Sequence, residues 1–369
     1  MRARRTRTTS TTAAICAATL LAAILLIVGC AGTPPAEEGT VATRPAAEAE
    51  GEIAAGAADE PQGPATPSLE MTEPGPGPYD LALRLEQGAT YTMNSTIDQT
   101  VTESMMGMMI EITQHIVSEY DFDVLEARDD ESLHLRLTYR IIDVDLSAGG
   151  SDDVRAALQA SMADANESLK TIFDALTGIH FDLEVARDGS VIRFTGADDY
   201  RTLLMQSAAQ VSDASLAAVD EMLSGLLSDE TLMNAWSLSL GHVPPYPVSV
   251  GDSWTREMTL AQGMAMTIEN VYTLTEVTRD SYTVAIDGVV RASDDQTGTD
   301  VNYPGFSVTI DLDGTQSGQV TAARQTGWIV SQTTLLDATG QMTLEQDDPP
   351  NVKIDGTFST TTTTTTTAD

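Results

Sequence analysis

Residues 133–138 read Leu-His-Leu-Arg-Leu-Thr, and this strict alternation of apolar and polar side chains decides the fold class. A period of two places the three leucines on one face of an extended chain and the polar side chains on the other. The same alternation recurs at 81–85 and 308–312, and turn signals such as Asp188-Gly189 and Asp313-Gly314 separate such runs. The pattern predicts half-buried antiparallel strands.

Two stretches break this period and predict helices. Ser151 can cap a helix that Gly178 ends, with its apolar side chains near one face. The second stretch, from about 198 to 240, is predicted to form two or three helices, interrupted near Gly225 and Ser228-Asp229. We expect these amphipathic helices to cover one face or end of the sheet, so the predicted fold class is α+β, mainly antiparallel β.

Three short matches, in the same order along the chain, suggest an internal duplication. Residues 85–92 compare with 248–255, since each has a glycine followed three residues later by an aromatic residue. Residues 124–129 compare with 274–280, and residues 185–191 with 321–328. The matches predict two similar β-rich halves, about 79–196 and 246–358, that form one large curved sheet or open barrel. Chance similarity among amphipathic strands is the alternative.

The amino-terminal segment predicts the location of the protein. Arginines precede an apolar run that ends in Ile27-Val28-Gly29-Cys30, which has the form of a lipobox. Residues 1–29 are therefore predicted to be a lipoprotein signal peptide, and Cys30 the lipidated residue that anchors the protein in the membrane. A permanent transmembrane helix is the alternative. Because Ala31 follows the cysteine, sorting rules in diderm bacteria favour the outer membrane, with the protein facing the periplasm or the cell surface.

Both ends of the chain have compositions that predict disorder. Residues 30–78 consist mostly of Ala, Pro, Glu, Gly and Thr, with few large apolar side chains to offset the entropy of ordering. They are expected to form a flexible tether between the anchor and a globular domain at 79–358. Residues 359–369 are rich in threonine and are expected to be a disordered tail.

Composition excludes several classes of protein. Cys16 leaves with the predicted signal peptide, so the mature chain holds only Cys30 and can form no internal disulfide or cysteine metal site. With 19 Lys and Arg against 55 Asp and Glu, the chain is too acidic for a nucleic-acid-binding protein. Adaptation to a salty medium and binding of divalent cations both remain open as reasons for the acidity.

The chain resembles a family of predicted bacterial lipoproteins of unknown function, found among planctomycetes and similar groups. The resemblance rests on Leu-x-Leu-x-x-Gly-x-x-Tyr at 83–91, on a Met-rich hairpin with many Thr and Gln, and on Pro-Val-Ser-Val-Gly-Asp-Ser-Trp at 247–254. It covers roughly 79–358. The family implies no activity and no catalytic residues that could be carried over.

The sequence contains no strong candidate for a catalytic or metal-binding site. The four histidines, His115, His134, His180 and His242, have no zinc-site spacing, and Gly-x-Ser-x-Gly is absent. Asp311-Leu312-Asp313-Gly314 is similar to a fragment of a calcium loop, but the later ligand positions do not fit. The sequence therefore predicts no catalytic residue, no metal site and no cofactor.

Methionines crowd one predicted hairpin, at Met105, Met106, Met108 and Met109. Thioethers can bind copper(I), and they can also form an adaptable apolar surface for a lipid or a partner protein. Ordinary hairpin packing is the third interpretation. Met264 and Met266 lie in the corresponding place of the second half and fit all three.

These observations predict a non-catalytic, lipid-anchored envelope protein. We expect it to bind an apolar ligand or lipid in a cavity between the sheet and the helices, with the Met-rich hairpin as a contact. The alternative is a structural or protein-interaction module of the envelope without a ligand cavity. An enzyme is the third class, and the partners expected are the membrane, through Cys30, and an apolar ligand or an envelope protein.

Overall fold

The computed structural model describes residues 77–105, 107–128, 131–150, 166, 170, 174, 177–207, 228–260, 266–292, 301–303, 306–346 and 353–368. The predicted signal peptide, Cys30 and the tether up to residue 76 lie outside these ranges. So does most of the predicted helix at 151–178.

The first half of the chain supplies the strands β1 (Thr90–Met105), β2 (Met108–Ala127), β3 (Leu133–Gly150), β4 (His180–Val185) and β5 (Val191–Thr195). The helices α3 (Ala197–Ser207) and α5 (Asp229–Ser239) follow. The second half supplies β6 (Ser253–Leu260), β7 (Met266–Val277), β8 (Ser281–Ala292), β9 (Val301–Tyr303), β10 (Phe306–Ala323), β11 (Ile329–Gln346) and β12 (Lys353–Ala368).

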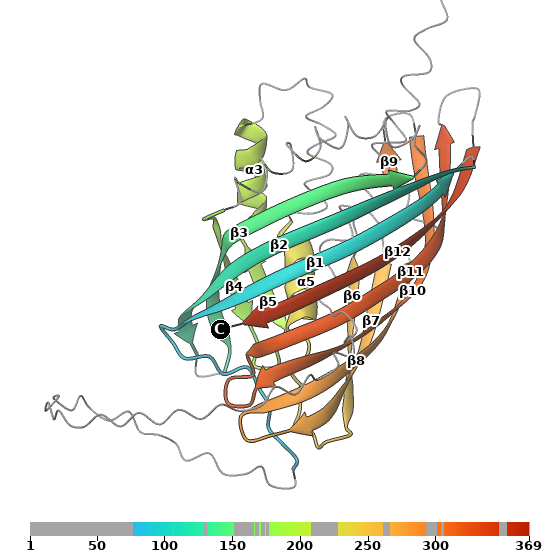
Figure 1. Cartoon of the computed structure of the whole chain (residues 1–369). Helices are drawn as coiled ribbons and strands as arrows, with labels where there is room; N and C mark the ends of the chain where they lie inside the picture. The colour runs from blue at the N-terminus through green and yellow to red at the C-terminus, as the bar shows by residue number, and fades with distance from the viewer. Residues whose placement is uncertain are drawn as a thin grey trace, which may run out of the picture.

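All these strands belong to one curved antiparallel sheet (Figure 1). Its order is β5-β4-β3-β2-β1-β12-β11-β10-β8-β7-β6, and β9 pairs with β10. Each half of the chain is a meander, and the two meanders join where β1 pairs with β12. Within the described residues the sheet stays open, with β5 and β6 as its edges.

The strand ends define two ends of the sheet. The base is the end that carries the β2–β3, β4–β5, β7–β8 and β10–β11 connections. The rim is the opposite end, where β1 turns into β2 and where β10 and β12 begin. One face of each long strand is buried; we call it the inner face and the other the outer face.

The two halves repeat the same local geometry at the base. Gly88 N donates to Val124 O at 2.8 Å, and Gly251 N donates to Leu274 O at 2.7 Å. A register shift follows directly in both places, after Val124 in the β2–β3 pair and after Leu274 in the β7–β8 pair. A β-bulge of this kind bends its strand and increases the local twist. The matching bulges therefore curve the two meanders at equivalent positions.

The predicted strand at 81–85 is not a strand, although Leu81, Leu83 and Leu85 are buried as the alternation indicates. Its backbone crosses the base and bonds to turns instead of a ladder. Leu83 N donates to Arg187 O at 2.8 Å, and Arg84 N donates to Thr326 O at 2.7 Å. The segment thus ties the β4–β5 turn of one half to the β10–β11 turn of the other.

The expected disordered tail at 359–369 is a second correction, because residues 353–368 form β12 in the centre of the sheet. Threonine is β-branched and favours extended backbone, so a run of threonines suits a strand as well as a polar tail. The strand alternates like any other, with buried threonines at 360, 362, 364 and 366.

The prediction of an α+β fold with amphipathic helices covering the sheet is wrong: the structure is mainly antiparallel β, and only α3 and α5 are helices among the described elements. Each spans 11 residues, a length of about 16 Å. Eleven paired strands about 4.8 Å apart form a sheet far wider than either helix. None of the described helices is long and apolar enough to cross a membrane.

Candidate functional site

The buried side chains of the inner face form two separate apolar clusters. The base cluster is the larger and includes Phe122, Leu135, Trp236, Tyr282 and Trp328. The rim cluster contains Val101, Met105, Leu238, Met258, Met266, Ile268, Val290, Ile310, Leu312, Leu336, Ala338, Met342 and Phe358. A compact domain needs one core, so the second cluster marks the rim half of the inner face as a candidate site.

Helix α5 occupies the inner side of the base. Ser228 caps it by accepting a hydrogen bond from Thr231 N, as the predicted break at Ser228-Asp229 indicates. Trp236 packs edge-on against Tyr120 and Phe122 of β2, with ring centroids 5.3 and 5.2 Å away. Ser237 Oγ accepts a hydrogen bond from Val191 N of the edge strand β5 at 3.1 Å. The helix therefore fills the space between the sheet edges near the base.

Methionines distinguish the rim cluster. Met105, Met258, Met266 and Met342 come from β1, β6, β7 and β11, and all are at most 7% exposed. Unbranched thioether side chains adapt to contacts of varying shape, which suits a surface that receives a flexible apolar ligand. Side chains of four strands thus contribute one adaptable apolar surface.

A row of polar side chains lies between the two clusters. Pairing register aligns Gln114 of β2 with Gln99 of β1, and Gln99 with Thr362 of β12. The same line crosses Leu336 of β11, a member of the rim cluster, before it reaches Gln316 of β10. It then passes Gly288 of β8 and reaches Asn270 of β7. We call the four amide residues the amide row; its members are 1 to 4% exposed.

The protein satisfies this row only in part. Gln99 Nε2 donates to Thr362 Oγ1 at 3.1 Å, and Gln316 Nε2 donates to Thr334 Oγ1 at 3.4 Å. The described structure offers no hydrogen-bond partner to the side-chain oxygens of Gln99, Gln316 and Asn270, or to either polar atom of Gln114. An unsatisfied buried polar group costs about 1–3 kcal/mol of folding free energy. Further hydrogen-bond partners for the amide row are therefore expected.

The backbone makes room for the amide at one end of the row. A Cβ atom at Gly288, the neighbour of Asn270 in β8, would overlap Asn270 Oδ1. The row then reaches β6 at Arg256, which pairs with Asn270 in the ladder. Arg256 is neutralised by Asp188, with Nη2 3.1 Å from Oδ2. Burial raises the pKa of Asp188, but hydrogen bonds from Ser190 and the Arg256 charge outweigh it and leave the pKa lowered.

The structure separates the predicted Met-rich contact residues. Met105 is buried in the rim cluster, 7% exposed, whereas Met108 and Met109 at the start of β2 are 43% and 59% exposed. Met106 lies outside the described residues. The hairpin therefore places one methionine on the inner face and two on the surface of the rim.

The histidines occupy different environments. His115 Nδ1 is 2.7 Å from Asp98 Oδ1 on the exposed outer face, and His180 is also exposed. His242 is buried at the base, where Nε2 lies 3.0 Å from Gly327 O. Burial lowers the pKa of His242 to about 4, which keeps its ring neutral. Across the described part of the chain, no three His, Cys, Asp or Glu side chains are placed to hold a metal ion.

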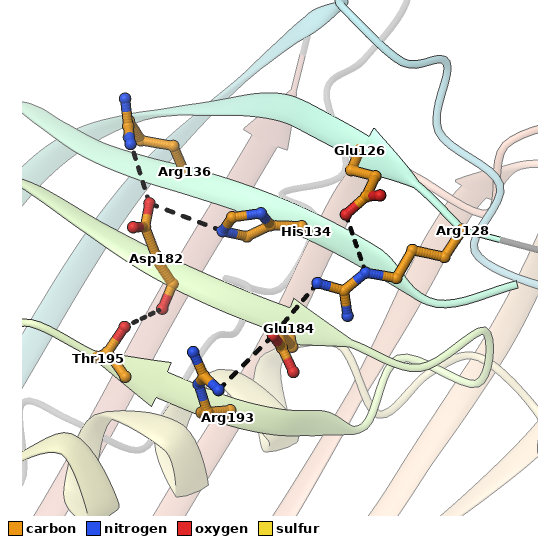
Figure 2. A network of polar contacts seen from close by, with 8 residues as sticks. All are labelled: Glu126, Arg128, His134, Arg136, Asp182, Glu184, Arg193 and Thr195. Carbon is orange, nitrogen blue, oxygen red and sulfur yellow. Dashed lines mark hydrogen bonds and ion pairs between the residues drawn. The ribbon is translucent and has the colours of Figure 1, made fainter. Parts of the chain in front are cut away.

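A network of ion pairs covers the outer face of β2 to β5, as Figure 2 shows. Asp182 Oδ1 is 3.2 Å from Arg136 Nε, and Glu184 Oε1 is 3.3 Å from Arg128 Nη2. His134 and Arg193 extend the network at 4.0 and 3.9 Å. Acids and bases alternate across the strands, so the network joins the short strands β4 and β5 to β3 and leaves little charge for a ligand.

The alternation within each single strand does not predict the amide row. Gln99, Gln114 and Gln316 each occupy an inward position of an alternating run, and this parity is the signal that could have found them. Their alignment depends on pairing register, above all on β12, whose sequence predicts a tail instead of a strand.

Fold and inner face together define a class of protein: a single open antiparallel sheet whose enclosed face carries two apolar clusters and an uncharged polar row. The chain belongs to a family of unknown function, DUF6263, whose model matches residues 130–329. The match runs from the β2–β3 turn to the start of β11, and so includes α3 and α5. The predicted membership of an uncharacterised family is confirmed, while lipidation and a planctomycete origin remain predictions.

Similarity to proteins of known structure is weak. Lipovitellin, described for its lipid–protein interactions, matches with a TM-score of 0.31 and 7% identity, over 74% of this chain and 25% of that one. An outer membrane channel from Pseudomonas putida F1 matches with a TM-score of 0.18 and 9% identity, over 80% of this chain and 100% of that one. The chain thus spans a quarter of the length of lipovitellin. No curated protein matches it in sequence.

Proposed function

We propose that this protein is a non-catalytic, lipid-anchored protein of the cell envelope that binds an acyl chain on the inner face of its sheet. The rim cluster carries the proposal, since it is a second apolar surface, rich in methionine and separate from the core at the base. Cys30 would supply the anchor and the residues before Gly77 the tether. In this proposal the outer membrane holds the anchor, and the domain faces the periplasm or the surface.

The shape of the sheet supports an apolar ligand at the rim instead of the base. At the base, α5 and its aromatic contacts fill the inner side, and Leu238 near the end of α5 contributes to the rim cluster. Toward the rim, β3 extends beyond its pairing with β4, which covers only Leu133–Thr138. The outer face of β1 carries Thr96, Asp98 and Thr100, which favour contact with water. An apolar ligand would therefore bind the inner face.

The experiment is recovery of bound lipid. The full chain with Cys30→Ser, which removes the anchor lipid, would be purified and examined by native mass spectrometry and lipid extraction. We expect an acyl lipid in near-stoichiometric amount. Met342→Lys, which places a charge in the rim cluster, should abolish it, and Met109→Lys, at an exposed position of the same rim, should not.

Folding must be controlled in this experiment. If Met342→Lys does not fold, Val290→Thr adds one hydroxyl to the rim cluster at nearly constant shape and should reduce the lipid content. Recovery of the folded Cys30→Ser chain without lipid, from cells and after incubation with oleic acid, would refute the proposal. Retention of that variant in the membrane fraction would refute the anchor.

Exposed Met108 and Met109 favour a second candidate, a protein-interaction module that docks through the tip of the β1–β2 hairpin. Crosslinking from position 109 in cells would then give one discrete partner. Replacement of both methionines by serine should abolish that crosslink without changing the lipid content. A background pattern of crosslinks would contradict this candidate.

A further inference from the structure

The amide row differs from the polar groups found in ordinary sheet interiors. Its four amide side chains are inward-facing and 1 to 4% exposed, and they occupy one line across the strands from β2 to β7. Within the described residues, each of the four has at least one side-chain atom without a hydrogen-bond partner. The other buried side-chain atoms without a partner in this part of the chain belong to Tyr200, His242, Arg256, Tyr282, Trp328 and Thr364. One ligand that forms hydrogen bonds with all four amides accounts for these unpaired atoms more simply than four unrelated packing defects in one register line.

The place of the row links it to the rim cluster. Two residues further toward the rim, β1, β11, β8 and β7 carry Val101, Ala338, Val290 and Ile268, all members of that cluster, while β10 carries Gly314 and β12 the buried Thr360. Two residues of a strand span about 7 Å, so the polar line borders the apolar surface directly. On β1, the inward side chains between the row and the rim are Val101, Glu103 and Met105, so the buried carboxyl of Glu103 interrupts the apolar surface there. On β11, Leu336, Ala338 and Met342 continue the apolar surface over six residues, about 20 Å. A molecule with a polar head and a long apolar chain matches the order of surfaces along β11.

The chemistry of the row selects the head group. Amides, a threonine hydroxyl and backbone are uncharged, and the one ionised side chain in line, Arg256, already pairs with Asp188. A charged head group would lose its hydration here without gaining an opposite charge. A hydroxyl both donates and accepts, so it can pair with a glutamine oxygen or with a glutamine nitrogen.

We propose that the amide row binds the uncharged, hydroxyl-bearing head group of an acyl lipid whose chain lies on the rim cluster. The chemical class is that of an acylglycerol or a neutral glycolipid. This inference rests on the proposed function, because it assigns the head group of the ligand whose chain that function places at the rim.

Two probes with the same chain test the head group. Monooleoylglycerol carries two free hydroxyls, and methyl oleate carries none. We expect the full chain with Cys30→Ser to bind monooleoylglycerol at least about tenfold more tightly than methyl oleate, as one to two net hydrogen bonds would give. Affinities would be measured by displacement of a fluorescent fatty acid below the critical micelle concentration.

Variants then assign the preference to the row. Gln99→Leu combined with Gln316→Leu should reduce the preference to within about twofold and leave methyl oleate binding intact. Thr100→Val, on the outer face of β1, is the matched control and should keep the tenfold preference. Because the two leucines remove unsatisfied amides, the ligand-free variant should unfold at the same temperature or higher. A preference retained in the folded variant would overturn the assignment.

The outcomes separate this inference from the proposed function. If the chain with an unmodified amide row binds both probes equally, the head-group assignment is overturned. The acyl-chain site would remain valid, and the amides would be hydrated by water alone. Failure of both probes and of oleic acid to bind would overturn the proposed function itself. Tighter binding of oleic acid than of monooleoylglycerol at pH 8 would show that a charged head is preferred, which also overturns the inference.

Discussion

At the scale of single residues, folding strongly alters the ionisation of His242. It is 1% exposed, and burial is the main cause of its lowered pKa, although the Gly327 carbonyl accepts a hydrogen bond from its ring. Below pH 6.5 the unfolded chain binds a proton at this residue, while the folded chain binds one only near pH 4. The folded state therefore loses stability as the pH falls through this window.

We predict that His242 lowers the free energy of unfolding by about 2 kcal/mol between pH 7 and pH 5. Urea unfolding at the two pH values measures this change. In His242→Gln the contribution should disappear, whereas His115→Gln, which removes an exposed ring, should retain it. An equal pH dependence in His242→Gln and the parent chain would contradict the prediction.

Elements of the sheet depend on partners that come from distant parts of the chain. Asn166 is an example: its Oδ1 accepts from Leu146 N, and its Nδ2 donates to Leu146 O, both at 2.9 Å. One side-chain amide thus pairs with the edge of β3 as a neighbouring strand would. An edge that exposes such groups can pair with another molecule, so this contact protects the rim half of β3.

We predict that Asn166→Ala destabilises the protein by about 1–2 kcal/mol, the cost of leaving a strand amide and carbonyl without this partner, and increases aggregation. Chemical unfolding and light scattering at 37 °C would measure the two effects. Lys170→Ala, at an exposed position nearby in sequence, serves as the control. Unchanged scattering in Asn166→Ala would argue against a protective role.

The register of β12 depends on one aromatic residue. A run of threonines looks the same after a shift of two, so its pattern alone does not fix the pairing. Phe358 lies in the rim cluster beside Gly340 of β11, and a Cβ at Gly340 would lie 2.5 Å from the Phe358 ring and overlap Asp311 O. Gly340 therefore provides the space in which Phe358 fixes the strand.

We predict that Gly340→Ala costs at least about 2 kcal/mol, because overpacking a close contact forces the backbone or the ring to move. Thr339→Ala changes the adjacent, exposed position and should cost less than about 0.5 kcal/mol. Thermal unfolding of both variants would give the comparison. Equal midpoints for the two variants would contradict the role of Gly340.

The sequence predicts the strands whose inner face is apolar, such as 133–138, and the helix start at Ser228-Asp229. It fails at β12, because threonine is common both in strands and in polar tails, and only tertiary pairing decides between them. It fails again at 81–85, whose alternation is real but whose backbone bonds go to two turns. The amide row follows from register, which local patterns do not determine across distant strands.

At the scale of the whole molecule, β12 is the strand through which the two meanders join. It pairs with β1 over Met93–Met105 and with β11 over Ser331–Glu345. Without it, both central strands would expose unpaired edges, and the rim cluster would lose Phe358. Stability of the sheet as one unit therefore depends on residues that resemble a dispensable tail.

We predict that a chain ending at residue 352 does not unfold in a single cooperative transition. Circular dichroism and limited proteolysis would show lost strand content and cleavage between the halves. A full-length control with serine at Thr361, Thr363 and Thr365, whose side chains face outward, should remain folded. A truncated chain with the parent unfolding midpoint would contradict this role.

The pairing of β1 with β12 also determines the order in which parts of the sheet can form. Gln99 and Thr362 bond across the β1–β12 pair although 263 residues separate them in sequence. A chain that emerges from the ribosome can complete its first meander early, but the middle of the sheet forms only after β12 has emerged. The inner face of the joined sheet therefore exists only after the whole chain has been made, and an incomplete chain lacks it.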